Sequence, residues 1–147
     1  MVAAPTLALG KTIYENDNAG IPYYLLNFVV VNFGTAALQV LIPEERPNGG
    51  STKSFPSGHA SAAFSGATYV HFRYSPYEAR WLYAMATFVA FSRVYGDRHH
   101  LHDVLASAGL SFLSSYFLVK NKNSNKTYSV SYNPENKELS FNFLYRF

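Results

Sequence analysis

The sequence predicts a mainly α-helical fold, a bundle of about four main helices followed by a C-terminal β-hairpin. Three observations carry this prediction: an uncharged stretch over residues 21–43, two apolar segments of helical length between residues 78 and 119, and alternation of polar and apolar side chains after residue 127. The 147 residues correspond to about one domain. With 48% hydrophobic and only 14% charged residues, the chain falls outside the composition of disordered proteins.

The longest helix is expected over the uncharged stretch from Ile21 to Pro43. Asp17, a side chain typical of helix starts, stands shortly before it. The stretch is longer than the roughly 20 residues that an α-helix needs to cross a bilayer. Because Asn27, Asn32 and Gln39 interrupt the apolar run, a membrane span and a buried helix of a bundle are both open interpretations.

Three further helices are expected downstream of a polar connector. The first, Ser57 to Phe72, is rich in alanine, serine and glycine, which let helix backbones approach closely. The second and third are expected over Glu78–Tyr95 and Leu101–Val119. Their apolar cores are shorter than a typical span, so they fit either core helices or short, tilted spans.

The last part of the chain changes character. Residues 120–126 (KNKNSNK) form a polar linker. Beyond it, apolar and polar residues alternate on both sides of Asn133-Pro134-Glu135-Asn136, a sequence with turn chemistry. We therefore expect a helical domain over residues 1–119 and a β-hairpin over residues 127–147, whose aromatic face packs on the helices or on a membrane surface.

Composition narrows the classes of function. The net charge of +3 is too small and too scattered along the chain to predict nucleic-acid binding. The absence of cysteine excludes a disulfide framework, a zinc ribbon and thiol catalysis. Twelve Phe and twelve Tyr are typical of proteins at membrane interfaces, although the mean hydropathy of −0.06 is too polar for a chain made only of spans.

Reactive side chains concentrate in three short stretches: Arg46-Pro47, Pro56-Ser57-Gly58-His59, and Ser92-Arg93 with the His99 and Asp103 that follow. His99 and Asp103 are four residues apart, so on a helix they would share one face. The carboxylate would then orient the imidazole and raise its basicity, which suits a nucleophile or a general base.

The remaining residues of these stretches bear on phosphate binding. Ser57 and Gly58 before a helix offer free backbone N–H groups and the positive end of the helix dipole, which attract anions. His59 at the helix start is suited to protonate a leaving oxygen. Arg46 and Arg93 are forked donors that match phosphate oxygens. Together these residues predict a phosphoryl-transfer site, provided that the fold brings them together.

The three stretches resemble the signature of the type 2 phosphatidic acid phosphatase (PAP2) superfamily, which shares its fold and site with vanadium haloperoxidases and bacterial class A acid phosphatases. That signature reads Lys-x6-Arg-Pro, then Pro-Ser-Gly-His, then Ser-Arg-x5-His-x3-Asp. The second part is complete here at Pro56–His59 and the third at Ser92–Asp103, whereas the first has only Arg46-Pro47. The resemblance covers residues 2–119 and implies a reduced PAP2-like helical core.

The resemblance implies a role for each matching residue. His99 would attack phosphorus and form a phosphohistidine, Asp103 would orient it, and His59 would protonate the leaving group. The phosphate oxygens would be held by a larger set: Arg46, Arg93 and the backbone of Ser57 and Gly58. The phosphatases of this superfamily require no metal, so neither a metal nor another cofactor is expected.

Two departures from the signature stand out. Gln39 occupies the position of the superfamily lysine and brings no charge to a phosphate, so we consider Lys53, in the loop before His59, as its substitute. Membrane members of the superfamily have six spans, whereas this chain has room for about four helices. The N-terminal segment MVAAPTLALGK is not typical of a signal peptide and is expected to be the stub of a helix, in a truncated or a compact variant.

The resemblance favours a phosphatase that acts on a lipid phosphomonoester or diphosphate, such as phosphatidate, phosphatidylglycerol phosphate, a polyprenyl diphosphate or lipid A. The expected location is a bacterial-type inner membrane with the site facing the periplasm, or the periplasm itself. Two alternatives stay open: a soluble periplasmic acid phosphatase, and a non-catalytic lipid-phosphate-binding or membrane scaffold protein with a site degenerate at Gln39. A vanadate-dependent haloperoxidase is disfavoured by the small size of the chain. No oligomeric state is predicted.

Overall fold

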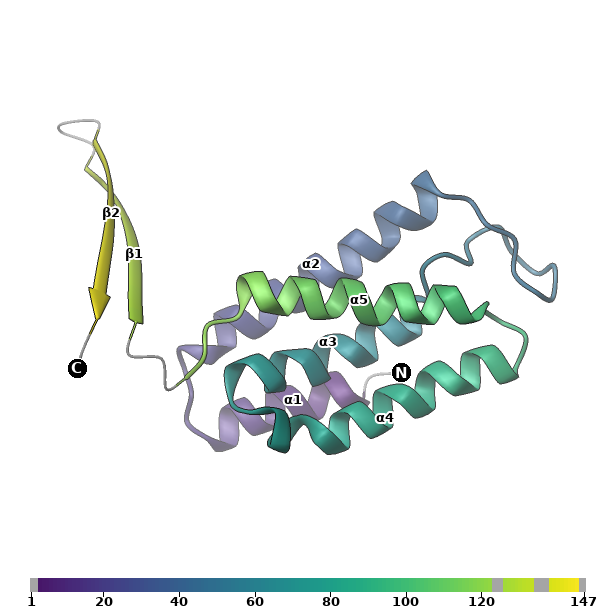
Figure 1. The fold of residues 1–147 in the computed structure, drawn as a ribbon, viewed down its shortest axis with the longest axis horizontal. Coiled ribbons are helices and arrows are strands. Elements are labelled where there is room, and N and C mark those ends of the chain that lie inside the picture. Colours follow the sequence, from purple (N-terminus) through teal and green to yellow (C-terminus); the bar gives the residue numbers. More distant parts are fainter. Residues whose placement is uncertain (1–2, 123–125, 134–137, 146–147) are drawn as a thin grey trace.

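The computed structural model describes residues 3–122, 126–133 and 138–145, with side chains described over residues 3–122. Five helices follow one another in the described part (Figure 1): α1 (Ala3–Tyr14), α2 (Gly20–Leu41), α3 (Gly58–Arg73), α4 (Pro76–Tyr95) and α5 (Leu101–Leu118). The chain is therefore mainly helical, as predicted, but the expected count of about four helices is wrong by one.

The additional helix, α1, arises because its small residues allow close packing on α3. Ala4 and Ala8 are buried in the core. Gly66 of α3 makes the approach possible, since a Cβ atom there would lie 2.7 Å from the carbonyl oxygen of Ala4. A helix this short owes its stability to such packing rather than to its intrinsic propensity.

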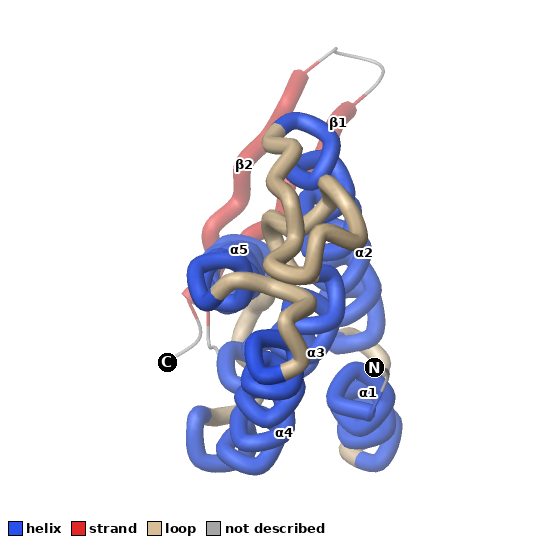
Figure 2. Tube along the Cα trace, turned by 90° about the vertical axis from the view of Figure 1, so that its right-hand side faces the viewer, coloured by secondary structure: helices blue, strands red, loops and turns tan. Residues whose placement is uncertain are grey.

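The centre of the bundle is α3, which contacts each of the other four helices. The end-on view in Figure 2 shows it among them. Most residues from Ala60 to Val70 are buried, and most of these are Ala, Ser or Gly. The small-residue stretch thus lets neighbouring backbones approach closely, as its composition predicts.

Buried hydroxyls fix the register of α5 along α3. Ser107 donates to the carbonyl oxygen of Ser57 at 2.9 Å, and Ser111 donates to the carbonyl oxygen of Ser61 at 3.1 Å. Sliding one helix along the other would break these hydrogen bonds inside the protein, which is unfavourable. This register brings Asp103, in the first turn of α5, next to the start of α3.

A buried ion pair closes the opposite end of the bundle. Arg73, in the last turn of α3, donates from Nε to Asp17 Oδ2 at 2.7 Å and from Nη2 to Asp17 Oδ1 at 2.6 Å. Asp17 also accepts from the backbone N–H of Gly20, the first residue of α2, in agreement with its predicted place at a helix start. The Nη1 atom of Arg73 donates to the carbonyl oxygen of Lys120, beyond α5, at 2.7 Å. The pair therefore ties three chain segments together.

The chain continues into β1 (Lys126–Asn133) and β2 (Glu138–Tyr145), which pair antiparallel with Val130 opposite Phe141. The side chains of both strands lie outside the described residues. The strand pair by itself does not establish the predicted hairpin with its aromatic packing face. That part of the fold, and the division into domains at residues 119 and 126, stay predictions.

Candidate active site

The motif residues meet at one end of the bundle. The connector between α2 and α3 (residues 42–57) and the turn between α4 and α5 (residues 96–100) lie there. Figure 2 faces this end and shows loop segments crossing the helix ends. The N-termini of α3 and α5 lie at the same end, so the dipoles of both helices add positive potential there.

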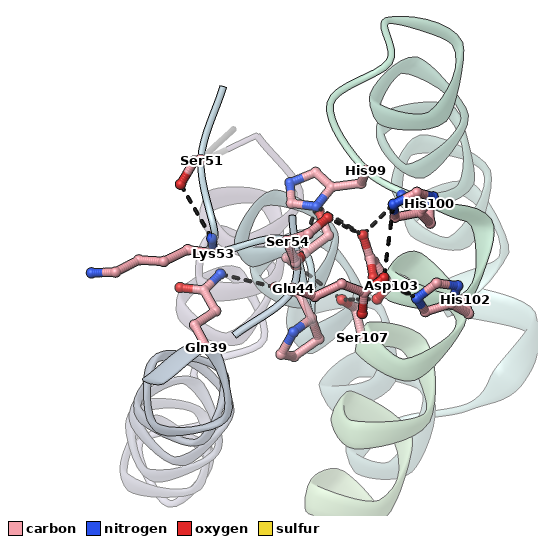
Figure 3. A network of polar contacts seen from close by, with 12 residues as sticks. Gln39, Glu44, Ser51, Lys53, Ser54, His99, His100, His102, Asp103 and Ser107 are labelled. Atoms are coloured by element: carbon pink, nitrogen blue, oxygen red, sulfur yellow. Dashed lines mark hydrogen bonds and ion pairs between the residues drawn. The ribbon is translucent and has the colours of Figure 1, made fainter. Parts of the chain in front are cut away.

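His99 is buried, with 3% of its surface exposed, in the turn before α5. Its Nδ1 lies 2.9 Å from the carbonyl oxygen of Ser54 and 3.3 Å from Asp103 Oδ2 (Figure 3). Because a carbonyl oxygen only accepts, Nδ1 carries the hydrogen. In the neutral imidazole the Nε2 atom therefore keeps a free lone pair, which is the state that a nucleophile requires.

The prediction that His99 and Asp103 share one helix face is wrong in one respect. Since α5 begins at Leu101, His99 precedes the helix and only Asp103 belongs to its first turn. The two side chains still meet because the turn folds back, with the N–H of His99 donating to the carbonyl oxygen of Arg93 at 3.2 Å. The contact is made by this turn and the helix start, not by helical spacing.

Asp103 is fully buried and fixed by its neighbours. Its Oδ2 accepts hydrogen bonds from Ser54 Oγ at 2.6 Å and from the backbone N–H of His100 at 2.8 Å. Hydrogen bonds to a carboxylate are stronger than those between neutral groups. They hold Oδ2 beside His99 Nδ1, a geometry that suits a positioning role for Asp103.

The start of α3 leaves donors free for a ligand. The Oγ atom of Ser57 is buried and has no hydrogen-bond partner among the described residues. The prediction that the backbone N–H of Ser57 is free is wrong, because this N–H donates to the carbonyl oxygen of Asp103 at 3.3 Å, and the carbonyl of Ser57 accepts from Ser107. A Cβ atom at Gly58 would meet Gln39 Nε2 at 3.9 Å and nothing nearer outside its own helix. The first turn of α3 therefore offers an open set of donors, of the kind that binds anions.

Two arginines present further unpaired donors. The Nε atoms of Arg46, in the connector, and Arg93, in the last turn of α4, are buried and lack a hydrogen-bond partner within the described part of the chain. Buried donors without an acceptor are rare in folded proteins, so each one needs an explanation. An oxyanion is the acceptor that fits a guanidinium group best.

His59, in the first turn of α3, lies among positive charges. Burial lowers its pKa most, and the charges of Arg93, His99 and Arg46 lower it further. Burial also lowers the pKa of His99, against the opposing effects of the Ser54 carbonyl and Asp103. Because charges shift a pKa only from nearby, Arg93, His99 and Arg46 lie close enough to His59 to act on its pKa.

Gln39 and Lys53 differ in how they lie relative to this site. Gln39, in the last turns of α2, donates from Nε2 to the carbonyl oxygen of Pro56 at 2.9 Å. It therefore lies next to the start of α3, although its amide is neutral. Lys53 is exposed, and its side chain extends away from His99 and Asp103 (Figure 3). The candidate substitute for the superfamily lysine therefore does not point toward His99 or Asp103.

Ser54 and Ser107 support the site, and the sequence analysis missed both. Ser54 binds His99 through its backbone carbonyl and Asp103 through its hydroxyl. Every residue has a backbone carbonyl, so no sequence signal marks this one. Ser107 stands four residues after Asp103 in α5, and this shared helix face is the only hint that the sequence offers.

An apolar groove of about 320 Å³ opens between α3, α4 and α5. Two of its wall residues, Val94 and Val104, directly follow Arg93 and Asp103 in the chain. Further wall residues are Phe64, Ala90, Phe91, Leu101, Leu105 and Ala108. The groove thus offers an apolar surface whose wall includes the residues that follow Arg93 and Asp103 in the chain.

Comparison with known proteins agrees with this chemistry. The sequence matches the PAP2 superfamily over residues 20–126. The lipid A 1-phosphatase of Porphyromonas gingivalis is 39% identical over 71 residues, which cover 46% of this chain and 16% of that protein. The matching part is therefore a small share of the relative's length. No solved structure matches the chain.

Proposed function

Because the chain belongs to the PAP2 superfamily, we propose that it is a phosphatase that hydrolyses a lipid phosphomonoester or diphosphate through a phosphohistidine, without a metal. One observation carries this proposal: three buried donor atoms, Arg46 Nε, Arg93 Nε and Ser57 Oγ, have no partner among the described residues. The imidazoles of His59 and His99 belong to segments at the same end of the bundle. A phosphate dianion would accept from the donors and lie against the nucleophile.

In the first step, the lone pair of His99 Nε2 attacks phosphorus while the bond from phosphorus to the leaving oxygen breaks. His59 gives its proton to that oxygen, so the lipid leaves as a neutral alcohol, or as a phosphomonoester where the substrate is a diphosphate. The arginines bind the charge that develops on the phosphoryl oxygens. Asp103 stabilises the positive charge that His99 acquires.

In the second step, a water molecule attacks phosphorus and the bond to His99 Nε2 breaks. His59, now neutral, takes a proton from that water. Inorganic phosphate leaves, and both histidines return to their starting states. His59 thus acts as an acid first and as a base second, which is the microscopic reverse of its first role.

Phosphate binding and release together test this proposal. Wild-type protein is expected to release phosphate from at least one substrate in a panel of lipid and soluble phosphomonoesters and diphosphates, in the presence of EDTA. Arg93→Ala is expected to weaken binding of inorganic phosphate by about tenfold or more, since a hydrogen bond to a charged group contributes roughly 1.5–3 kcal/mol. Lys53→Ala, the matched control cation, is expected to change it by less than about twofold. Turnover that disappears in EDTA and returns with a metal would contradict the metal-independent mechanism.

Gln39 supports a second candidate, a protein that binds lipid phosphate without hydrolysing it. Its side chain lies beside the start of α3 and supplies no charge there. The same experiment separates the two candidates, because a folded protein that binds phosphate and releases none from any substrate is a binding protein.

The pH dependence of the reaction follows from the two lowered pKa values. His59 must carry a proton and His99 must not, and the pKa of each lies below its ordinary 6.5. Activity therefore falls as pH rises through the pKa of His59 and falls as pH drops through the pKa of His99. We expect kcat/KM to peak on the acidic side of pH 6.5, with the alkaline limb lost in His59→Ala. A maximum above pH 7 would contradict these protonation states.

Membrane association is supported by two features. Among the described residues, α2 is the one helix long and apolar enough to cross a membrane. Its most apolar 18-residue segment has a mean hydropathy of 1.6, and 22% of that segment is buried. In addition, small residues fill the core while large apolar side chains lie outside, among them Phe33, Trp81, Phe88, Phe91 and Phe117. This distribution is typical of helices that face lipid.

The groove between α3, α4 and α5 would receive an acyl chain of the substrate. Ala108→Trp, which fills the groove, is expected to lower kcat/KM for long-chain lipid phosphates by about tenfold or more, because each buried CH2 group contributes roughly 0.8 kcal/mol. Short-chain substrates should change little. Gly109→Trp is the matched control, since a Cβ atom there meets nothing within 4 Å. Equal losses for long and short chains would contradict a role for the groove in chain binding.

A further inference from the structure

Four side chains that bind metals in other proteins gather on the outer side of Asp103. We define the Glu44 cluster as Glu44, in the connector, with His100, His102 and Asp103 around the start of α5. Glu44 Oε1 lies 2.7 Å from His102 Nε2 and 3.8 Å from His100 Nε2. His102 Nε2 also lies 3.2 Å from Asp103 Oδ1. One ligand atom each from Glu44, His102 and Asp103 falls within 4.8 Å of the others, and Figure 3 shows all four side chains together.

Asp103 is the residue that makes this cluster more than a surface ion pair. It is fully buried, and its Oδ1 has no hydrogen-bond partner in the part of the chain that the structure describes. Its other oxygen, Oδ2, already accepts from Ser54 and His100. One imidazole nitrogen, His102 Nε2, faces both Oδ1 and the carboxylate of Glu44. A single N–H cannot satisfy two carboxylates, whereas a cation between them interacts with both.

We propose that the Glu44 cluster is a binding site for a divalent transition-metal ion, with Zn²⁺ as the best match. Zn²⁺ takes imidazole nitrogen and carboxylate oxygen in tetrahedral sites, with bonds of about 2.0–2.2 Å. Glu44, His102 and Asp103 supply three ligands, and a water molecule supplies the fourth, because His100 Nε2 donates to the carbonyl oxygen of Glu45 at 3.2 Å. The His100 and His102 rings are nearly parallel, at 8°, with centroids 5.2 Å apart, so both face the same side of the turn.

Little movement is needed for the site to form. Ligand atoms around a tetrahedral Zn²⁺ lie roughly 3.3 Å apart for bonds of this length, so the 2.7 Å contact of Glu44 with His102 must open slightly. Glu44 is only partly buried and comes from a connector, so its carboxylate has room to adjust. The positive end of the α5 dipole opposes a cation, but two full carboxylate charges outweigh its partial charge.

A Zn²⁺ ion bound at the Glu44 cluster would act on the active site through Asp103. A cation on Oδ1 draws electron density from the carboxylate that holds His99 Nδ1–H through Oδ2. The positive charge that His99 acquires in the first step would then be less well stabilised, so Zn²⁺ would lower phosphate release. This consequence rests on the proposed phosphatase function, whereas metal binding itself does not.

Zinc binding to the full chain, measured by titration calorimetry in a metal-free buffer, tests the site without using activity. We expect one equivalent of Zn²⁺ per chain, with affinity weakened by about tenfold or more in both Glu44→Gln and His102→Ala. Glu45→Gln is the matched control, because it removes a carboxylate from the neighbouring position and should leave the affinity unchanged. The fold of each variant is checked by circular dichroism.

Two binding results would overturn the proposal. One is the absence of Zn²⁺ binding by folded wild-type protein at micromolar to submillimolar concentrations. The other is an equal affinity in Glu44→Gln and Glu45→Gln, which would locate the ion elsewhere. Phosphate release gives the second measurement: Zn²⁺ should inhibit the wild type more strongly than Glu44→Gln. If Zn²⁺ binds at the cluster but inhibits active wild type and Glu44→Gln equally, the proposed inhibition is wrong and the proposed metal site is retained.

Discussion

Replacing His99 with alanine is expected to abolish phosphate release, with kcat lowered by roughly a thousandfold or more. The substitution removes the only atom proposed to form a bond to phosphorus, so no covalent intermediate can form. The measurement is steady-state phosphate release from the best substrate of the panel, in EDTA. Trapping of ³²P on the protein after an alkaline quench, which preserves the acid-labile phosphohistidine, provides a second measurement, since label on wild type should be absent from His99→Ala.

His71→Ala is the matched control for this prediction. His71 is a partly buried histidine that lies in the last turn of α3 and contacts Tyr83 through Nδ1 at 3.0 Å. Its loss should leave kcat nearly unchanged. Preserved turnover in a folded His99→Ala protein would contradict the proposed mechanism outright.

His59→Ala sharpens the assignment of the two histidines. A general acid contributes about 10²–10⁴-fold, and it contributes least where the leaving group departs without a proton. The variant should therefore lose much more activity with an alkyl phosphate than with p-nitrophenyl phosphate. His99→Ala should lose activity with both. Equal losses with the two substrates in His59→Ala would contradict the role of His59 as the acid.

Replacing Arg73 with methionine is expected to destabilise the fold by about 3–5 kcal/mol, because it leaves the Asp17 carboxylate buried without its cation. Arg73 forms a bidentate pair with Asp17 and also holds the carbonyl oxygen of Lys120. The free energy of unfolding is measured by chemical denaturation. Arg80→Met, at an exposed arginine of α4, is the matched control and should change stability by less than about 1 kcal/mol. Similar losses in both variants would contradict a special role for the buried pair.

The pH dependence of this loss has a defined sign. Hydrogen bonds from Arg73 hold the pKa of Asp17 below its ordinary 3.8. The wild-type pair therefore stabilises the fold fully above that pH, and its contribution is lost as pH falls through the lowered pKa. In Arg73→Met, a buried unpaired carboxyl is more stable protonated, so the variant gains stability as pH falls. The difference between the two proteins should therefore shrink as pH falls, above about pH 4 because the variant gains stability and below about pH 4 because the wild type loses it. A constant difference would contradict this account.

The helical class of the chain followed from local patterns, which predicted only the stub of a helix where α1 forms. Long apolar runs bounded by polar residues predicted α2, α4 and α5 within a few residues of their observed ends. The N-terminal segment has no such run, and its helix depends on the contact of Ala4 with Gly66, a residue far along the chain. Contacts of this kind arise from packing and leave no periodic pattern in the segment itself.

The chemistry of the candidate site could be predicted from residue types and their order. A proline-serine-glycine-histidine helix start, two arginines and a histidine-aspartate pair predict phosphate binding and transfer wherever the fold unites them. The path of the backbone could not be predicted from residue types and their order. His99 lies outside α5, and Lys53 points away from the residues it was expected to join, because turns and connectors follow contacts that local sequence does not encode.

By itself, therefore, the sequence determined the class of fold and the set of reactive side chains. Only the tertiary structure decided three things: that the segments carrying Arg46, Arg93, His59 and His99 lie at one end of the bundle, that the Ser54 carbonyl selects the tautomer of His99, and that Glu44 meets His102. The physical reason is the same in each case. Ser54 and His99 are 45 residues apart in the sequence, and Glu44 and His102 are 58 residues apart. Contacts over such separations depend on how whole helices pack and how their loops close.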